Sequence, residues 1–355
     1  MKIMFYINTI SYGGAERVIV NLARQFVDKN FEVILVTSYA RDQEYEVDER
    51  IKRYVLLDKE NYGFVKKNVK CVKRIRELLK VENPDVLVSF MAEPNFRSVV
   101  ACFGKRTKTI VSVRNDPNKE YPNLIFRLCA RILYRFADGV VFQTEDAKKW
   151  FPKNIQRKSR IIFNQVDEAF YNSKFAGERS GIVTTGRLTL QKNHKLLIHA
   201  FASIADKIED NLVIYGEGEL RAELERLVSE LHLEERIYLP GRTKNVVEAI
   251  KSARLFVLSS DYEGMPNALL EAMALGIPCV ATDCPCGGPK MLFVNRAEDR
   301  LVPCGNVLEL SRAMEKILTD DSIDGSLEKE LSERFRPDVV HSEWNNYISF
   351  VEGKK

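Results

Sequence analysis

The stretch KIMFYINTISYGGAERVIVNLARQFVDKNFEVILVTSY, residues 2–39, decides the fold class of this chain. Its apolar runs at residues 2–8 and 31–39 have the length of strands, and residues 15–30 between them repeat apolar side chains at helical spacing. Gly13 and Gly14 mark the turn between the first strand and the helix. A strand, a helix and a strand within forty residues form a βαβ unit, which predicts an α/β protein with a parallel sheet.

The same alternation continues along the chain and then starts afresh. Apolar, β-branched runs recur at DVLVSF, TIVSV and GVVFQT, and, after a polar stretch, at GIVTTGR, NLVIYG, RIYLPG, RLFVLSS and PCVATD. We therefore predict two Rossmann-like domains, residues 1–168 and 176–336, with a boundary near residues 165–180. A last helix at 338–353 carries an apolar stripe that needs a partner surface.

Composition excludes several classes of protein. With 355 residues, 45% of them hydrophobic, the chain can bury two cores and is neither disordered nor fibrous. No apolar run is long enough to span a bilayer, and the first residues lack the features of a signal peptide, so we expect a cytoplasmic protein. The odd number of cysteines, seven, favours reduced thiols, and we predict no metal site at Cys284 and Cys286.

Charge is distributed unevenly between the two halves. Residues 1–164 carry 31 Lys+Arg against 19 Asp+Glu, a net charge of +12, and the remainder has a net charge of −8. An asymmetry of this size suggests that the first half faces an anionic surface, either membrane or nucleic acid.

Ligands of doubly wound sheets bind at the carboxyl ends of the strands, so the loops there are the candidate site. After the first strand, Gly13 and Gly14 fit either an anion site at a helix N-terminus or a tight turn. After the first strand of the second domain, Gly186 is followed by Arg187 and Lys192, which could bind phosphate or be solvated cations. Arg187 stands where a P-loop requires lysine followed by serine or threonine, so a P-loop NTPase is excluded.

The loop DYEGMPNALLE, residues 261–271, combines two acids with a helix start at Pro266. The helix dipole favours an anion near Asn267 and Ala268, while Glu263 and Glu271 could accept hydrogen bonds from sugar and ribose hydroxyls. An ordinary capped helix would account for Glu263 but not for Glu271. The loop Gly216-Glu217-Gly218 lacks the third glycine of a dinucleotide fingerprint and is read as a turn.

Four segments together resemble glycosyltransferase family 4, the retaining enzymes of the GT-B fold: GGAER, GRLTLQKN, EGMPNALLE and ALGIPCVATDCPCGGPKML. The resemblance runs over nearly the whole chain, and SDYEGMPNALLEAMALG and VVFQTEDAKKWFP are similar to the branch that builds capsule, O-antigen and other bacterial surface polysaccharides. It implies two facing Rossmann-like domains with a cleft between them, and a final helix that packs back on the first domain.

The resemblance also assigns roles to residues. Arg187 and Lys192 would hold the donor diphosphate, Glu263 the donor sugar and Glu271 the ribose. The other implied donor-site residues are Gly13, Gly14, Gly186, Arg242, Gly264, Met265, Pro266, Asn267 and Ala268. Many members carry a histidine on the acceptor side, where this chain has Arg114, Asn115 and Asp116, which we take as the acceptor-side candidates.

The implied reaction is retaining and independent of metal and cofactor. A hexose or N-acetylhexosamine would pass from a nucleoside-diphosphate sugar, expected to be UDP-linked, to a lipid-linked or growing glycan. Preorganised cations and N–H donors would stabilise the departing diphosphate. A nucleotide-sugar epimerase of the same fold, or a non-catalytic nucleotide-sugar-binding partner of another transferase, are the alternatives.

The segment FVKKNVKCVKRIRELLKV, residues 64–81, predicts a basic amphipathic helix. We expect its apolar stripe, Val65, Val69, Val72, Ile75 and Leu79, to belong to the core. Its cations, Lys66, Lys67, Lys70, Lys73, Arg74 and Lys80, are expected to join Arg127, Arg131 and Arg135 in holding the protein peripherally on an anionic membrane. Nucleic acid is not an expected partner, because no nucleic-acid-binding motif and no interleaved aromatic residue accompany these cations.

Overall fold

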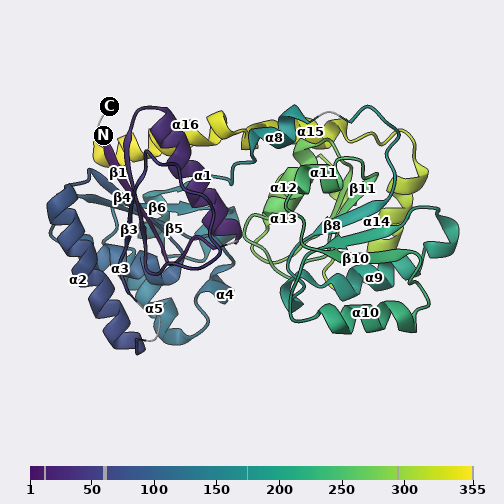
Figure 1. Ribbon diagram of the computed structural model, residues 1–355, viewed down its shortest axis with the longest axis horizontal. Helices are drawn as coiled ribbons and strands as arrows, with labels where there is room; N and C mark the ends of the chain where they lie inside the picture. The colour runs from purple at the N-terminus through teal and green to yellow at the C-terminus, as the bar shows by residue number, and fades with distance from the viewer. Residues whose placement is uncertain (12, 59–61, 174, 294–295, 354–355) are drawn as a thin grey trace. The chain divides into compact units, whose positions relative to one another are not determined.

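The computed structural model describes residues 1–11, 13–58, 62–173, 175–293 and 296–353 (Figure 1). The chain forms two compact units, Met1–Asn164 with Pro337–Lys355, and Gln165–Arg336. Each unit is built on one parallel sheet whose strand order reverses at the first strand, so both are doubly wound α/β structures, which confirms the predicted fold class.

The sheet of the first unit has the order β3-β2-β1-β4-β5-β6-β7. Its strands are β1 (Lys2–Ile7), β2 (Glu32–Thr37), β3 (Lys52–Val55), β4 (Val86–Phe90), β5 (Lys108–Ser112), β6 (Gly139–Phe142) and β7 (Ser159–Ile161). Its helices are α1 (Gly14–Asp28), α2 (Phe64–Glu82), α3 (Ala92–Cys102), α4 (Pro117–Glu120), α5 (Leu124–Leu133), α6 (Glu145–Lys149), α7 (Lys153–Arg157) and α16 (Pro337–Glu352).

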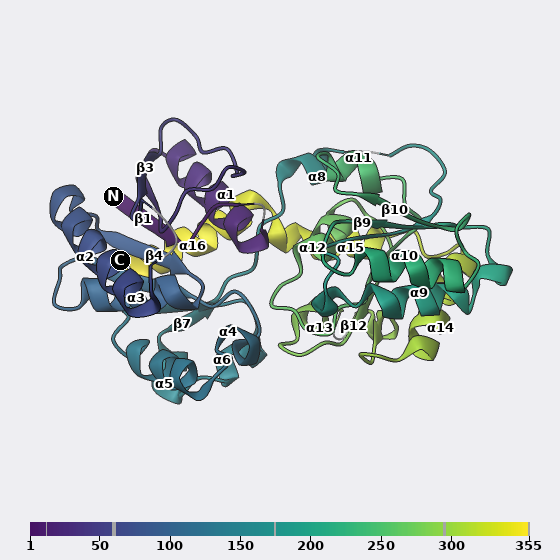
Figure 2. The ribbon, with the colours of Figure 1, turned by 60° about the horizontal axis from the view of Figure 1, so that its bottom comes forward.

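Alternate residues of β1 serve two separate cores. Phe5 and its odd-numbered neighbours pack with α1 and with Trp344 of α16, and Met4 and Tyr6 pack with α2 and α3 on the other face. Figures 1 and 2 show α2 and α3 side by side on that second face. The Tyr347 hydroxyl fastens α16 to the sheet, because it accepts the backbone N–H of Val140 at 2.8 Å.

The sheet of the second unit has the order β10-β9-β8-β11-β12-β13. Its strands are β8 (Ile182–Thr185), β9 (Leu212–Tyr215), β10 (Ile237–Gly241), β11 (Leu255–Leu258), β12 (Cys279–Thr282) and β13 (Leu301–Val302). Its α-helices are α8 (Glu168–Asn172), α9 (His194–Ala202), α10 (Arg221–Glu230), α11 (Val246–Ile250), α12 (Asn267–Ala274), α13 (Gly288–Phe293), α14 (Val307–Thr319) and α15 (Ser326–Ser332). Short 3₁₀ turns are η1 (Leu190–Lys192), η2 (Ala205–Lys207), η3 (Glu298–Arg300) and η4 (Glu333–Phe335).

One core of this unit lies between the sheet and the helices α9, α10 and α14. The strand order reverses between β8 and β11, so the loops that follow these two strands meet at the switch point of the sheet. This is the position that the candidate site occupies.

One prediction about α2 is wrong in part. Ile75 and Leu79 are buried as expected, but Val65 and Val69 are 73% and 62% exposed. At 3.6 residues per turn Val69 lies about 120° around the helix from Ile75, too far for one face to cover both. The apolar stripe therefore divides into a buried half and a half that faces solvent.

The described cysteines are all free thiols. Within the described ranges, no helix combines the length and the apolar character needed to cross a bilayer.

Candidate active site

The centre of the candidate site is an ion pair between the two switch-point loops. Lys192 Nζ lies 2.6 Å from Glu263 Oε1, and their side chains are only 16% and 9% exposed. Ser260 Oγ donates to the same carboxylate oxygen at 2.8 Å. The aliphatic part of Lys192 packs over Gly186, where a Cβ would lie 3.3 Å from Lys192 Cε. The pair is thus held in place from both loops.

Hydrogen bonds along the two loops reinforce this pairing. The backbone carbonyl of Gln191 accepts the backbone N–H of Asp261 at 2.9 Å. The side-chain amide of Gln191 donates to the carbonyl of Tyr262 at 3.0 Å. Asn193 Nδ2 donates to Asp261 Oδ1 at 2.7 Å, and Ser259 Oγ donates to the carbonyl of Lys192 at 2.9 Å. None of these residues was predicted as part of the site, although Gln191, Asn193 and Tyr262 directly adjoin Lys192 or Glu263 in the chain.

Helix α12 begins directly after the Glu263 loop. Pro266 occupies its N-cap position without a side-chain cap, and Glu271 lies one turn into the helix and is buried. Gly264 and Met265 are also buried, and Asn267 and Ala268 are partly exposed. This arrangement places the positive end of a helix dipole and two carboxylates within nine residues of chain.

The segment at the start of α13 and the loop after β9 each pack a glycine against one of the two switch-point loops. A Cβ on Gly288 would lie 1.9 Å from the carbonyl oxygen of Gly264, and one on Gly218 would lie 2.2 Å from that of Leu188. Neither position can carry a side chain without moving the opposing backbone. In the sequence, the adjacent Gly287 and Gly288 are the only local sign of the first of these contacts.

Burial controls the charge of groups beneath the site. Burial and the nearby Lys192 lower the pKa of His194 to about 4, so this imidazole is neutral at pH 7. Burial and Glu263 raise the pKa of the Cys284 thiol. Among the described residues, no three His, Cys, Asp or Glu side chains are grouped so that they could hold a metal ion.

The other predicted donor residues divide between the two units. Arg187 and Arg242 are exposed at the ends of β8 and β10. Gly13 and Gly14 belong to the first unit, where they start α1. A Cβ on Gly13 would lie 2.2 Å from Glu16 Oε2, so the carboxylate of Glu16 lies at this helix start. The roles assigned to these four residues stay predictions.

The acceptor-side candidates follow β5 in the first unit, and two of them are buried. The Arg114 guanidinium stacks 4.4 Å from the centre of the Phe90 ring and donates to Asn164 Oδ1. Asp116 accepts the backbone N–H of Asn118 at 3.0 Å and so caps α4. Buried Glu120 accepts the backbone N–H groups of Arg114 and Asn115, and burial raises its pKa to about 7. No pattern in the sequence pointed to Glu120, and an acceptor role for the three candidates stays a prediction.

Two family descriptions account for most of the chain. Residues 165–337 match the family described as glycosyl transferases group 1, and residues 12–170 match Glycosyltransferase Family 4.

Two relatives come from Campylobacter jejuni. The chain is 28% identical over 366 residues to GalNAc-alpha-(1->4)-GalNAc-alpha-(1->3)-diNAcBac-PP-undecaprenol alpha-1,4-N-acetyl-D-galactosaminyltransferase, with 99% of both chains covered. It is also 28% identical over 338 residues to N-acetylgalactosamine-N,N'-diacetylbacillosaminyl-diphospho-undecaprenol 4-alpha-N-acetylgalactosaminyltransferase, with 91% of both covered.

Among solved structures, HepE of Anabaena in complex with UDP is similar over 99% of this chain and 100% of its own, with a TM-score of 0.80 at 18% identity. That likeness establishes the GT-B fold. The two doubly wound sheets, the motif loops at the switch point and the match of both halves lead to one conclusion: the chain belongs to glycosyltransferase family 4.

Proposed function

We propose that this glycosyltransferase moves a hexose or N-acetylhexosamine from a UDP-sugar to a lipid-linked or growing glycan during surface polysaccharide synthesis, with retention of configuration. The observation that carries the proposal is the buried pair of Lys192 and Glu263 beside the start of α12. The pair places a cation suited to a diphosphate next to a carboxylate suited to sugar hydroxyls.

Each group has a distinct role in the proposed reaction. The bond between the sugar C1 and the diphosphate oxygen breaks, and Lys192 with Arg187 stabilises the charge that develops on the diphosphate. Glu263 accepts hydrogen bonds from the sugar, and Glu271 from the ribose. The acceptor hydroxyl forms the new bond to C1 and gives its proton to the leaving phosphate, so no metal or cofactor takes part.

Support for the donor and acceptor classes comes from similar proteins. HepE was crystallised with UDP, and the two Campylobacter transferases are named for sugars on diphospho-undecaprenol. A lipid-linked acceptor would require this protein to work at a membrane, and the net charge of +12 over residues 1–164 is suited to the anionic inner face of one.

The proposal is tested by incubating the protein with UDP-, GDP- and ADP-sugars and a diphospho-polyprenol glycan in detergent, with and without EDTA. We expect sugar transfer from one UDP-sugar that EDTA does not reduce, and a product whose anomeric configuration, read by NMR, equals that of the donor. Interconversion of donor sugars without an acceptor would instead identify an epimerase. Donor binding without turnover would identify a non-catalytic subunit.

A further inference from the structure

The sheet of the first unit has a switch point of its own, between β1 and β4. Tyr6 of β1 pairs with Ser89 of β4, and Asn8 and Met91 each lie two residues further along the chain. Both residues are therefore at the carboxyl edge of the sheet where the strand order reverses, which is where doubly wound folds bind ligands. The residues to which the proposed reaction assigns roles all belong to the second unit.

A buried arginine holds the side chain of Asn8 from inside the first unit. Arg97 of α3 is only 2% exposed, and its Nη1 donates to Asn8 Oδ1 at 2.8 Å. Ser38 Oγ donates to the same oxygen at 3.0 Å. Because a guanidinium can only donate, the atom of the amide that faces Arg97 must be the oxygen. The orientation of the Asn8 amide is thus fixed by two donors.

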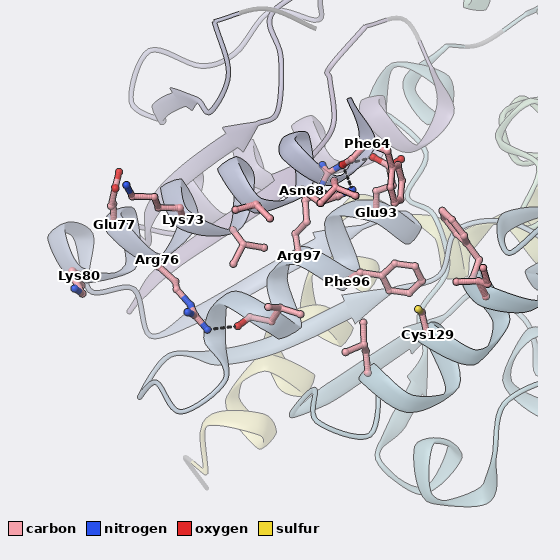
Figure 3. Close-up of a pocket in the computed structure, with 17 residues that line it drawn as sticks. Phe64, Asn68, Lys73, Arg76, Glu77, Lys80, Glu93, Phe96, Arg97 and Cys129 are labelled. Carbon is pink, nitrogen blue, oxygen red and sulfur yellow. Dashed lines mark hydrogen bonds and ion pairs between the residues drawn. The ribbon is translucent and has the colours of Figure 1, made fainter. Parts of the chain in front are cut away.

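The guanidinium of Arg97 is itself fixed by its other partners. Its Nη1 donates to Tyr6 Oη at 3.0 Å, its Nε donates to Asn68 Oδ1 at 2.7 Å, and its Nη2 pairs with Glu93. Figure 3 shows Arg97 reaching toward Asn68 and Glu93. The guanidinium cannot turn away from Asn8 without breaking these bonds.

Two neighbouring asparagines show by comparison what distinguishes Asn8. Asn95 of α3 accepts with its oxygen and donates its amide to the carbonyl of Ser112 at 2.9 Å. Asn68 of α2 also accepts with its oxygen and donates its amide to the carbonyl of Phe64 at 2.8 Å. Within the described ranges the amide nitrogen of Asn8 has no such acceptor, and the residue is partly exposed. Its N–H groups are therefore oriented donors that remain available at the edge of the sheet.

Met91, on the other side of this switch point, has a strained backbone. Its φ is 76° and its ψ is 158°, a conformation that residues other than glycine rarely adopt. Hydrogen bonds hold it there, because its N–H donates to the carbonyl of Ser112 at 3.3 Å and its carbonyl accepts the N–H of Asn95 at 3.0 Å. Backbone strain of this kind is concentrated beside ligand sites.

We propose that the side-chain amide of Asn8 donates a hydrogen bond to a hydroxyl oxygen of the acceptor sugar, and that Arg97 and Ser38 are positioning residues that orient this amide. Two donors on the amide oxygen, one of them a cation, polarise the amide and strengthen its N–H groups as donors. A donor that is fixed in advance favours a sugar with a hydroxyl at the matching position over one without it. The inference rests on the proposed function for identifying the ligand as an acceptor glycan.

The charge at this position favours the acceptor sugar over the donor diphosphate. Asn8 offers a neutral N–H group, and the cation behind it is buried and paired with Glu93. The groups that suit a diphosphate and a nucleotide sugar, Lys192 and Glu263, lie in the second unit. Asn8 is therefore suited to an uncharged sugar.

The test compares Asn8→Asp with the wild type in the full-length protein. The aspartate keeps an oxygen for Arg97 and Ser38 but replaces the donating amide nitrogen with an acceptor, so the packing role is retained and the proposed contact is lost. We expect the KM for the diphospho-polyprenol glycan to rise at least about tenfold, the equivalent of one hydrogen bond. The KM for the nucleotide sugar should not change, and the midpoint of urea unfolding should not fall.

Two further variants test the orientation of the amide. Asn68→Asp is the matched control, because it places a carboxylate against the same guanidinium at a residue whose amide is bonded within the protein, and it should leave both KM values unchanged. Ser38→Ala removes one donor to the Asn8 oxygen and should raise the acceptor KM about threefold. An unchanged acceptor KM in Ser38→Ala would remove its positioning role. An unchanged acceptor KM in Asn8→Asp, or a rise confined to the nucleotide sugar, would overturn the contact itself.

Nuclear magnetic resonance gives a readout that does not depend on turnover. In the ¹⁵N-labelled protein, the side-chain amide of Asn8 is identified by its absence from the spectrum of Asn8→Asp. We expect a methyl glycoside of one hexose or N-acetylhexosamine to shift this resonance, and UDP to leave it in place. A shift without sugar transfer to any acceptor would support the subsite and overturn the proposed reaction. Sugar transfer with no shift and an unchanged KM in Asn8→Asp would do the reverse, and the absence of both transfer and shift would overturn the two together.

Discussion

The amine of Lys192 and the carboxylate of Glu263 form an ion pair across 71 residues of sequence, and this pair joins the loop after β8 to the loop after β11. Neither group is free to turn toward solvent, because Ser260 and the packing over Gly186 fix their positions. A ligand that binds here meets charges that are already oriented, which is the condition under which electrostatic catalysis is most effective.

Replacing Lys192 with alanine should lower kcat by about 100- to 1,000-fold, because one preorganised donor to the departing diphosphate is lost. The measurement is sugar transfer at saturating donor, with circular dichroism to verify folding. Lys195→Ala is the matched control, since Lys195 is an exposed lysine on the following helix that pairs only loosely with Glu223 at 4.0 Å. Equal activity of the two variants would remove the leaving-group role from Lys192.

Replacing Glu271 with glutamine should abolish the stabilisation of the protein by UDP. A ligand at about 100 times its dissociation constant adds roughly 2.7 kcal/mol to the free energy of unfolding, and the buried carboxylate is the proposed partner of the ribose. Thermal unfolding with UDP, GDP and ADP measures this effect and also identifies the nucleotide. A UDP shift that persists in the variant would place the ribose elsewhere.

A methyl group at position 288 should impair the site without touching a charged residue. In Gly288→Ala the new Cβ collides with the carbonyl of Gly264, so the start of α12 has to move. A displacement of about 1 Å can cost 100-fold in kcat/KM, and a loss of that order is expected. Gly63→Ala, where a Cβ meets no atom within 4 Å, is the control. Unchanged kcat/KM in Gly288→Ala would mean that this contact does not set the geometry of the donor site.

The free energy of unfolding should decrease as the pH falls, because His194 is protonated more readily in the unfolded chain than in the folded one. Its pKa is lowered to about 4 in the folded protein and is 6.5 when unfolded, so below pH 6.5 the unfolded chain binds a proton that the folded one does not. The free energy of unfolding should decrease by up to about 3 kcal/mol between pH 6.5 and pH 4 on this account. Urea unfolding of the wild type and of His194→Met over this range isolates the contribution, and parallel pH profiles would contradict it.

Removing one hydroxyl should loosen α16 from the sheet. Tyr347→Phe leaves the backbone N–H of Val140 and the carbonyl of Lys158 without their partner, which should cost about 1–3 kcal/mol of unfolding free energy. Urea denaturation measures the loss. Tyr238→Phe is the control, because the Tyr238 hydroxyl bonds only at an exposed position, to the carbonyl of Glu235.

Periodicity in the sequence predicted the fold class, because buried parallel strands are continuous apolar runs that are visible one segment at a time. The motif loops could also be recognised locally, because their glycines, Pro266 and the two glutamates stand close together in the chain. The sequence could not show contacts between residues that are far apart in the chain and meet only in the folded protein. Glu328, for example, is fully buried at the start of β12, where it accepts the N–H of Cys279 and pairs with Arg300.

The exposed face of α5 shows a second limit of sequence patterns, because its apolar residues are not covered. Its composition, LIFRLCARIL, is that of a core helix, and no local pattern distinguishes an apolar side chain that finds a neighbour from one that does not. The same limit led to the error at Val65 and Val69. Only the position of the helix relative to the sheet decides which apolar residues are covered.

The return of α16 to the first sheet sets an order on synthesis. Trp344 completes a core whose strands leave the ribosome some 200 residues earlier, at β6 and before. At about 5–20 residues per second, the nascent first unit spends roughly 10–40 seconds with an uncovered apolar face. The half that is made first is therefore the half that completes its core last, and during translation it exposes apolar surface of the kind that chaperones bind.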